Sequence, residues 1–225
     1  MNQRNCIHNG TTSGKRLGAW DYLRWKDIKP IEHQGKIVAA KIIIYAGHDE
    51  QYFSFISSET YFELEKWKKY RQDSGEEIYE NSWVMRQLCD TKKGYYHHGT
   101  IKNPEKLKSS GIKRLMEDAL LTQGIRKKSN LKRNRYEFQT DHGLRKWFKT
   151  RCEISGMKSI NIEILMGHSI GISDSYYKIT EVELLVVYLK AVKHLAISKE
   201  NLLQNQVSEV VLKNQQYVYI HIFIF

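Results

Sequence analysis

The sequence predicts an α+β fold that is mostly helical and contains a small antiparallel β-hairpin. Apolar residues recur at helical spacing in the second half of the chain, and two β-rich segments lie between residues 36 and 57. No alternation of strand, helix and strand appears that would indicate a parallel sheet. The chain has 225 residues, of which 41% are hydrophobic and 12% aromatic. This composition suits one substantial domain with a sizeable core.

The first half of the chain predicts a short helix, a hairpin and a longer helix. Gly18–Trp25 has the pattern of a short helix. Lys36–Tyr45 is rich in β-branched residues, and a turn-like segment separates it from Gln51–Ser57, where polar and apolar residues alternate. Ser58 is placed to cap a helix that ends near residue 73. This half therefore supplies the hairpin and one long helix.

The middle of the chain predicts one helix between two polar segments. Asp90–Pro104 is rich in His and Gly and is predicted to be a loop that includes the pair His97-His98. Ser109 or Ser110 opens a helix that extends to Gly124. A strongly basic segment follows, Arg126–Arg135. Such a run is usually a solvated loop, and beside a DNA-binding surface it would clamp the backbone.

Three helices are predicted in the last part of the chain. Asp141 can cap a helix that stops at Gly156, and Ser159 can cap a second that ends at Gly167. Thr180 is followed three residues later by a glutamate, which is the capping-box pattern at the head of a third helix. The apolar face of this helix extends to about residue 197.

The net charge indicates the kind of binding partner, and the cysteine pattern indicates the redox environment of the protein. The formal net charge is +11, which favours a polyanion such as nucleic acid, although many basic proteins are merely soluble. Cys6, Cys89 and Cys152 form no disulfide framework or zinc pattern, so a reducing cytosolic setting is expected. The N-terminus is polar and lacks an apolar signal region, so secretion is not expected. The apolar tail Tyr217–Phe225 is shorter than the roughly 18 residues of a membrane helix, so no membrane partner is expected.

A basic group of residues that ends in tyrosine is the candidate for chemistry. His142 and Arg145 lie three residues apart, on one face of a helix near its anion-attracting N-terminus. His168 begins the turn after Gly167, and Tyr177 follows in the segment SDSYYK. Together these groups would bind a phosphodiester and attack it. Each taken alone also has an ordinary structural explanation. No Gly-rich phosphate loop or metal-ligand motif accompanies them.

This ordered set resembles the signature of the tyrosine recombinase (phage integrase) family. The match is to HGLR at His142–Arg145 and MGHSIGISDSYYK at Met166–Lys178, with 23 positions from Arg145 to His168 and nine more to Tyr177. An earlier match is GKRLG, which carries Arg16. The segments GAWDYLRW and LMGHSIGISDSYYK look most like archaeal integrases. The resemblance spans residues 13 to about 197.

The resemblance implies a role for each residue. Arg16 and Arg145 would hold the non-bridging oxygens of the scissile phosphate, and Tyr177 would attack it to form a 3′-phosphotyrosyl link. His142 and His168 would hydrogen-bond the phosphate, and a hairpin lysine would protonate the leaving 5′-oxygen. No cofactor or metal is expected, because the protein–DNA ester stores the bond energy. The implied partners are duplex DNA and copies of the chain in a tetramer, in the cytoplasm on the nucleoid.

Two assignments stay open. The hairpin offers Lys36 and Lys41, and Lys41 is preferred because it lies nearer the turn. The nucleophile is Tyr177 or its neighbour Tyr176, and the nine-residue interval favours Tyr177.

The chain also departs from the family pattern. Arg16 lies so near the start that no N-terminal core-binding domain fits before it. We therefore expect a polar N-terminal stub at 1–12, a catalytic domain at 13–198 and a tail at 199–225. The alternative to a recombinase is a non-catalytic DNA-binding remnant of a split or decayed integrase. A type IB topoisomerase agrees less well with the residues around His168, and an RNA-binding module lacks a stacking-aromatic motif.

Overall fold

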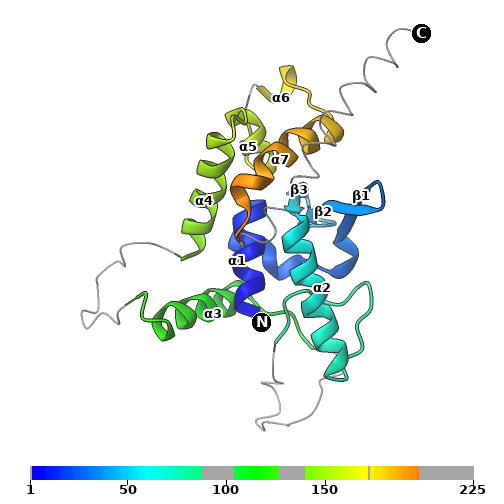
Figure 1. The fold of residues 1–225 in the computed structure, drawn as a ribbon, viewed down its shortest axis with the longest axis vertical. Helices are drawn as coiled ribbons and strands as arrows, with labels where there is room; N and C mark the ends of the chain where they lie inside the picture. The colour runs from blue at the N-terminus through cyan, green and yellow to red at the C-terminus, as the bar shows by residue number, and fades with distance from the viewer. Residues whose placement is uncertain (1, 88–103, 127–139, 172, 198–225) are drawn as a thin grey trace.

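The computed structural model describes residues 2–87, 104–126, 140–171 and 173–197, and these contain seven α-helices, two 3₁₀ helices and one sheet. The α-helices lie around the sheet (Figure 1) and are α1 (Asn2–Ser13), α2 (Ser58–Asp73), α3 (Ser109–Thr122), α4 (Thr140–Ile154), α5 (Ser159–Leu165), α6 (Ser173–Tyr176) and α7 (Glu181–Leu195). The predicted fold class, mostly helical with a small antiparallel sheet, is confirmed.

The sheet has three antiparallel strands in the order β1-β2-β3. The predicted hairpin is present as β2 (Lys36–Ile44) and β3 (Tyr52–Ser57). The sequence pattern did not predict β1 (Ile28–His33), which pairs along β2 at the edge of the sheet. Pro30 lies in β1, and an edge strand tolerates proline because one side of it forms no ladder hydrogen bonds.

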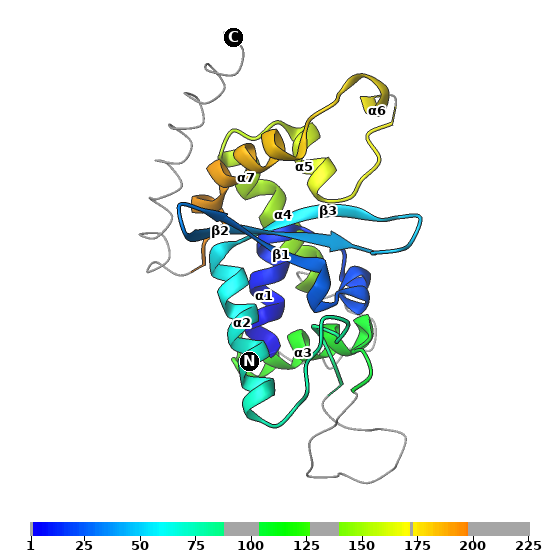
Figure 2. The same cartoon turned by 90° about the vertical axis from the view of Figure 1, so that its right-hand side faces the viewer.

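Helices cover both faces of this sheet, as Figure 2 shows with the sheet between α7 and α5 on one side and α2 and α1 on the other. Ala39 and Phe55 lie in one apolar cluster with residues of α4, α5 and α7. Ala40, Ile42 and Ile56, their neighbours along the strands, lie in a second cluster with residues of α2. The alternation of side chains along a strand therefore joins two helical layers through one small sheet.

Helix α1 occupies residues that were expected to form a polar stub. It lies between α4 and α2 and packs against both (Figure 1). A polar helix can be buried only if its side chains find partners. The hydroxyls of Thr12 and Ser13 donate to the carbonyls of His8 and Asn9, at 2.7 and 2.6 Å. No apolar periodicity in the sequence indicated this helix, because its buried face is polar.

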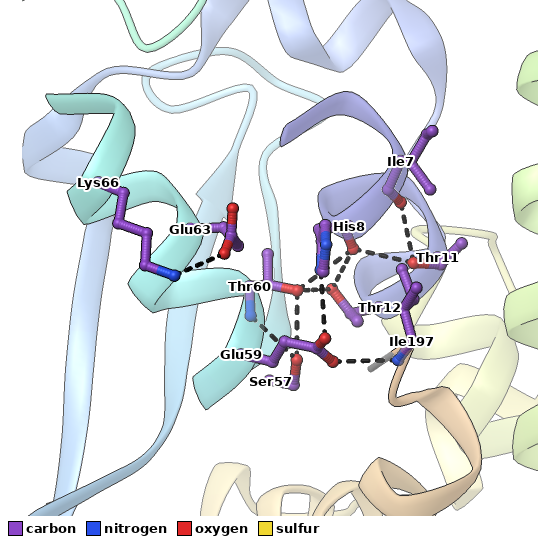
Figure 3. Close-up of polar contacts among 10 residues, drawn as sticks. All are labelled: Ile7, His8, Thr11, Thr12, Ser57, Glu59, Thr60, Glu63, Lys66 and Ile197. Carbon is purple, nitrogen blue, oxygen red and sulfur yellow. Dashed lines mark hydrogen bonds and ion pairs between the residues drawn. The ribbon is translucent and has the colours of Figure 1, made fainter. Parts of the chain in front are cut away.

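A buried polar cluster joins α1 to α2 and to the end of α7 (Figure 3). The hydroxyls of Thr12 and Thr60 lie 2.9 Å apart, and Thr60 also contacts the carbonyl of His8 at 3.3 Å. The Glu59 carboxylate accepts a hydrogen bond from the backbone N–H of Ile197 at 3.1 Å. These contacts hold the N-terminal helix and the end of α7 to the start of α2.

The other predicted helices form with small changes at their ends. Ser57, one residue before the predicted Ser58, caps α2 by accepting from the N–H of Thr60 at 3.3 Å. Lys158 is the N-cap residue of α5 in place of Ser159. The capping box of α7 is present as predicted, with Thr180 as the N-cap.

One predicted helix differs from the structure, and other predicted segments lie outside the described residues. The short helix expected at Gly18–Trp25 is replaced by two 3₁₀ helices, η1 (Leu17–Tyr22) and η2 (Trp25–Asp27). The tail at 199–225 and most of the predicted loop 90–104 and basic segment 126–135 lie outside the described residues. Within the described part of the chain, no helix combines the length and apolar character needed to cross a membrane.

Candidate active site

Arg145 is the centre of a hydrogen-bonded group formed by three distant parts of the chain. Its guanidinium donates from Nη1 to the carbonyl oxygen of Gly14 at 2.6 Å. Its Nη2 lies 2.6 Å from Nε2 of His168. Arginine only donates, so the Nε2 of His168 accepts and its Nδ1 carries the proton. That Nδ1 contacts the carboxylate of Glu163. Helix α4 thus meets the turns after α1 and α5 at this point.

Glu163 fixes the orientation of His168 and was not singled out from the sequence. It lies on α5, and its other carboxylate oxygen accepts from the Lys149 ammonium at 2.7 Å. The hydrogen bond from Lys149 and that from His168 hold the pKa of Glu163 below its ordinary value. The carboxylate is therefore ionised at neutral pH. Its position five residues before His168 is the only signal that the sequence offers for it.

The charge of Arg16 acts on Arg145, although the two residues lie far apart in the sequence. Burial lowers the pKa of Arg145, and the positive charge of Arg16 adds to this lowering, while Tyr52 opposes it. Both arginines also act on Tyr52, whose pKa burial raises. The Arg16 side chain is exposed, directly before η1. The structure therefore brings Arg16, Arg145 and His168 into one basic region.

His142 is exposed in the first turn of α4, one turn before Arg145. Its position agrees with the shared helix face expected from a spacing of three residues. Among the described residues, no group of three or more His, Cys, Asp or Glu side chains is arranged to hold a metal ion.

Lys41 contacts an acid at the start of α7. Its ammonium lies 2.5 Å from Oε2 of Glu181 and 4.8 Å from the centre of the Phe53 ring. The alternative, Lys36, begins β2 and pairs with His33 at the far end of the sheet from the β2–β3 turn. Lys41 is thus on the sheet face that α7 covers, engaged with a carboxylate.

Tyr177 lies at the end of α5 away from His168. Its hydroxyl donates to Oδ1 of Asn161 at 2.7 Å, and Asn161 is itself buried, with 2% of its surface exposed. The phenol lines a cavity of about 410 Å³ between the end of α4, the start of α5 and α7. Tyr176, by contrast, is 84% exposed. No sequence signal pointed to Asn161 as a partner of the tyrosine.

Comparison with known proteins finds similar solved structures but no similar sequence family. No protein-family model matches the chain, and neither does any curated protein. Its structure is similar to that of XerA recombinase, with 18% identity and a TM-score of 0.49 over 88% of this chain and 58% of the other. It is also similar to XerH site-specific recombinase in a pre-cleavage complex with its difH substrate, with 17% identity and a TM-score of 0.47 over 77% of this chain. This chain spans 41% to 58% of the length of these two proteins.

Proposed function

We propose that this chain is the catalytic domain of a tyrosine-type site-specific DNA recombinase or integrase. The observation that carries the proposal is the hydrogen bond between Arg145 and His168, which lie 23 positions apart in the sequence. They are the pair whose spacing resembles the family signature. The charge of Arg16, the first arginine of that signature, acts on the same guanidinium.

The basic region suits binding of a scissile phosphate. A guanidinium has five N–H donors, and the described contacts of Arg145 use one on Nη1 and one on Nη2. The remaining donors of Arg145 and the exposed guanidinium of Arg16 would hold the non-bridging oxygens. Charge grows on these oxygens in the transition state, so fixed cations accelerate the reaction.

The proposed reaction exchanges one phosphate ester for another. The Tyr177 oxygen attacks phosphorus and its proton passes to His142, while the bond from phosphorus to the 5′-oxygen breaks. Lys41 protonates that leaving oxygen. The resulting 3′-phosphotyrosyl ester keeps the energy of the cleaved bond, so a 5′-hydroxyl can reverse the step without a nucleotide. The proposed partners are duplex DNA and further copies of the chain in a tetramer.

A suicide duplex tests both the reaction and the nucleophile. Its nick releases the 5′-hydroxyl fragment, so the covalent protein–DNA adduct accumulates and is counted on a denaturing gel. We expect the wild type to form the adduct without magnesium. Tyr177→Phe should abolish it, and Tyr176→Phe should leave most of it, because the two side chains point in different directions: Tyr176 is 84% exposed, whereas the Tyr177 hydroxyl donates to Asn161.

The opposite pattern would assign the nucleophile to Tyr176. If the wild type formed no adduct, even with a supplied N-terminal core-binding domain, the chain would be a non-catalytic DNA-binding remnant. A duplex with a scrambled sequence serves as the specificity control.

A further inference from the structure

A buried phenol hydroxyl lies in the basic region of the candidate site without a hydrogen-bond partner. Tyr52 is the first residue of β3 and pairs with Ile44 at the end of β2. Its hydroxyl oxygen is buried, and no group among the described residues forms a hydrogen bond with it. Buried polar groups are almost always hydrogen-bonded, because an unpaired one has lost its contacts with water and gained none in return. This exception indicates that the partner comes from outside the chain.

The packing of the Tyr52 ring places this hydroxyl beside the turn that carries His168. A Cβ at Gly167 would collide with Cε1 and Cζ of the ring, so the edge that bears the hydroxyl lies directly against the residue before His168. The centre of the Tyr45 ring lies 6.4 Å from that of Tyr52. Tyr45 has φ +55°, an uncommon and strained conformation for a bulky side chain. The hairpin and the Gly167 turn therefore fix the position of the hydroxyl together.

The positive charges that act on this hydroxyl belong to groups that can only donate hydrogen bonds. Burial raises the pKa of Tyr52, and the charges of Arg145 and Arg16 oppose this rise. The phenol therefore keeps its proton at neutral pH. A guanidinium has no acceptor atom, so neither arginine can accept a hydrogen bond from the hydroxyl. An anion with several oxygens is complementary to these three donor groups, and a phosphodiester has two non-bridging oxygens.

Resting on the proposed function, we propose that Tyr52 is a further catalytic residue, whose hydroxyl donates a hydrogen bond to a non-bridging oxygen of the scissile phosphate. It acts beside the guanidiniums of Arg145 and Arg16. Charge grows on the non-bridging oxygens in the transition state, so a fixed donor stabilises that state more than the ground state. The ring is already held against Gly167 before DNA binds, so the hydroxyl needs little reorganisation. No sequence motif pointed to this tyrosine.

The stability of the DNA-free protein distinguishes an unpartnered hydroxyl from a structural one. Tyr52→Phe removes a hydroxyl that has no hydrogen-bond partner among the described residues, so the urea midpoint of unfolding should stay at or above the wild-type value. Tyr188→Phe is the matched contrast, because the buried hydroxyl of Tyr188 donates to the carbonyl oxygen of Thr12 at 2.8 Å. That variant should unfold at a lower urea concentration. An equal loss in the two variants would assign the Tyr52 hydroxyl to the fold and overturn the proposal.

Inorganic phosphate tests the anion contact without requiring catalysis. Thermal unfolding is measured in phosphate and in chloride of equal ionic strength, because an ion that binds only the folded protein raises the midpoint. The wild-type midpoint should be higher in phosphate, and Tyr52→Phe should show less than half of this increase. Tyr70→Phe changes an exposed tyrosine on α2 and should respond like the wild type. A Tyr52→Phe response equal to that of the wild type would rule out the contact.

The suicide duplex tests the contact with the scissile phosphate itself. Tyr52→Phe should form the covalent adduct about 10- to 100-fold more slowly than the wild type, the range for one hydrogen bond to a charged group. Two further duplexes carry a methyl group in place of one or the other non-bridging oxygen. On the duplex that lacks the contacted oxygen, Tyr52→Phe should react as fast as the wild type.

Equal slowing of Tyr52→Phe on all three duplexes would indicate a structural role and overturn the proposal. If the phosphate response of the midpoint held but the wild type formed no adduct on any duplex, the anion contact would stand and the recombinase assignment would fail.

Discussion

Glycine is required at two positions beside the Arg145–His168 pair. Gly14 has φ +60°, and a Cβ there would lie 2.4 Å from the ring of Phe148. Gly167 has φ +68°, and a Cβ there would lie 2.4 Å from the ring of Tyr52. Gly14 supplies the carbonyl that Arg145 binds, and Gly167 directly precedes His168. The left-handed backbone disfavours a side chain at both positions, and the close approach of the ring leaves no room for one.

Gly167→Ala should therefore be costly, and Gly171→Ala is its matched control. Gly171 also has a positive φ of +63°, but a Cβ at this position would meet no atom within 4 Å. The control should lose only the roughly 1 kcal/mol of left-handed strain. Gly167→Ala should lose about 3 kcal/mol, since Tyr52 must also move. Urea unfolding measures both, and equal losses would contradict the steric argument.

Lys15, the residue before Arg16, is buried with a lowered pKa. Its ammonium donates to Oδ1 of Asn9 at 2.5 Å and lies 4.2 Å from the centre of the Trp20 ring. Burial lowers its pKa from 10.5 to about 7, and nearby Cys6 opposes this slightly. Above pH 7 the folded lysine is neutral while the unfolded lysine stays protonated. Unfolding then takes up a proton, so stability rises with pH.

We expect the free energy of unfolding to rise by about 2 kcal/mol between pH 7 and 9, given 1.36 kcal/mol per unit of pKa difference. The rise should end near pH 9, because burial raises the pKa values of Cys6 and Cys152 from 9.0 to about 12 and these act in the opposite direction. Denaturant unfolding at several pH values measures the slope. Lys15→Met should flatten it, and a flat wild-type profile would show that Lys15 stays charged when folded.

At the scale of elements, a buried ion network ties the end of α2 to the chain that follows it. The Arg71 side chain is fully buried and donates to both carboxylate oxygens of Glu76, at 3.0 and 2.5 Å. It also donates to the carbonyl oxygens of Trp83 and Val84, and Arg86 reaches the same carboxylate at 3.0 Å. Helix α2 is thereby held to residues 76–86 by charge and hydrogen bonds together.

Glu76→Gln should destabilise the protein by about 3 kcal/mol, because it leaves the Arg71 charge buried and uncompensated. Asp118→Asn is the control, since it removes the acid of the exposed pair Arg114–Asp118 on α3. That change should stay within about 0.5 kcal/mol. Thermal and urea unfolding report both values. A Glu76→Gln effect as small as the control would mean that water screens Arg71.

At the scale of the whole molecule, the basic charge and the position of the site lead to one prediction about binding. The net charge of +11 includes the exposed Arg16 and the basic segment 126–135. Tyr177→Phe removes the proposed nucleophile and leaves these cations in place. It should keep DNA affinity and lose about 10³-fold of it between 50 and 200 mM salt, as expected for six or more phosphate contacts.

Fluorescence anisotropy with a labelled duplex measures this salt dependence. A duplex of unrelated sequence should show a similar slope, because phosphate contacts carry no sequence information. An affinity that stayed constant over the salt range would rule out a surface that grips the DNA backbone.

The elements that the sequence predicts well are those with local signals. Helix α7 has its capping box and an apolar stripe, and the β2–β3 hairpin has β-branched strands around a turn. These signals act within a few residues, so a pattern along the chain reveals them. Helix α1 and strand β1 lack such signals. The former is stabilised by hydroxyl contacts to α2, and the latter by pairing with β2.

The fold class, the basic charge and the spacing of the candidate residues follow from the sequence alone, and these residues are Arg16, His142, Arg145, His168 and Tyr177. Which of them meet depends on the tertiary structure. It joins Arg145 to His168 through a 2.6 Å contact, and the charge of Arg16 acts on Arg145, while Lys41 contacts Glu181 and Tyr177 contacts Asn161. The physical reason is that the spacing of residues in the sequence determines which of them share a face of a helix. The packing of α5 and α7 against the rest of the molecule determines which side chains that face contacts.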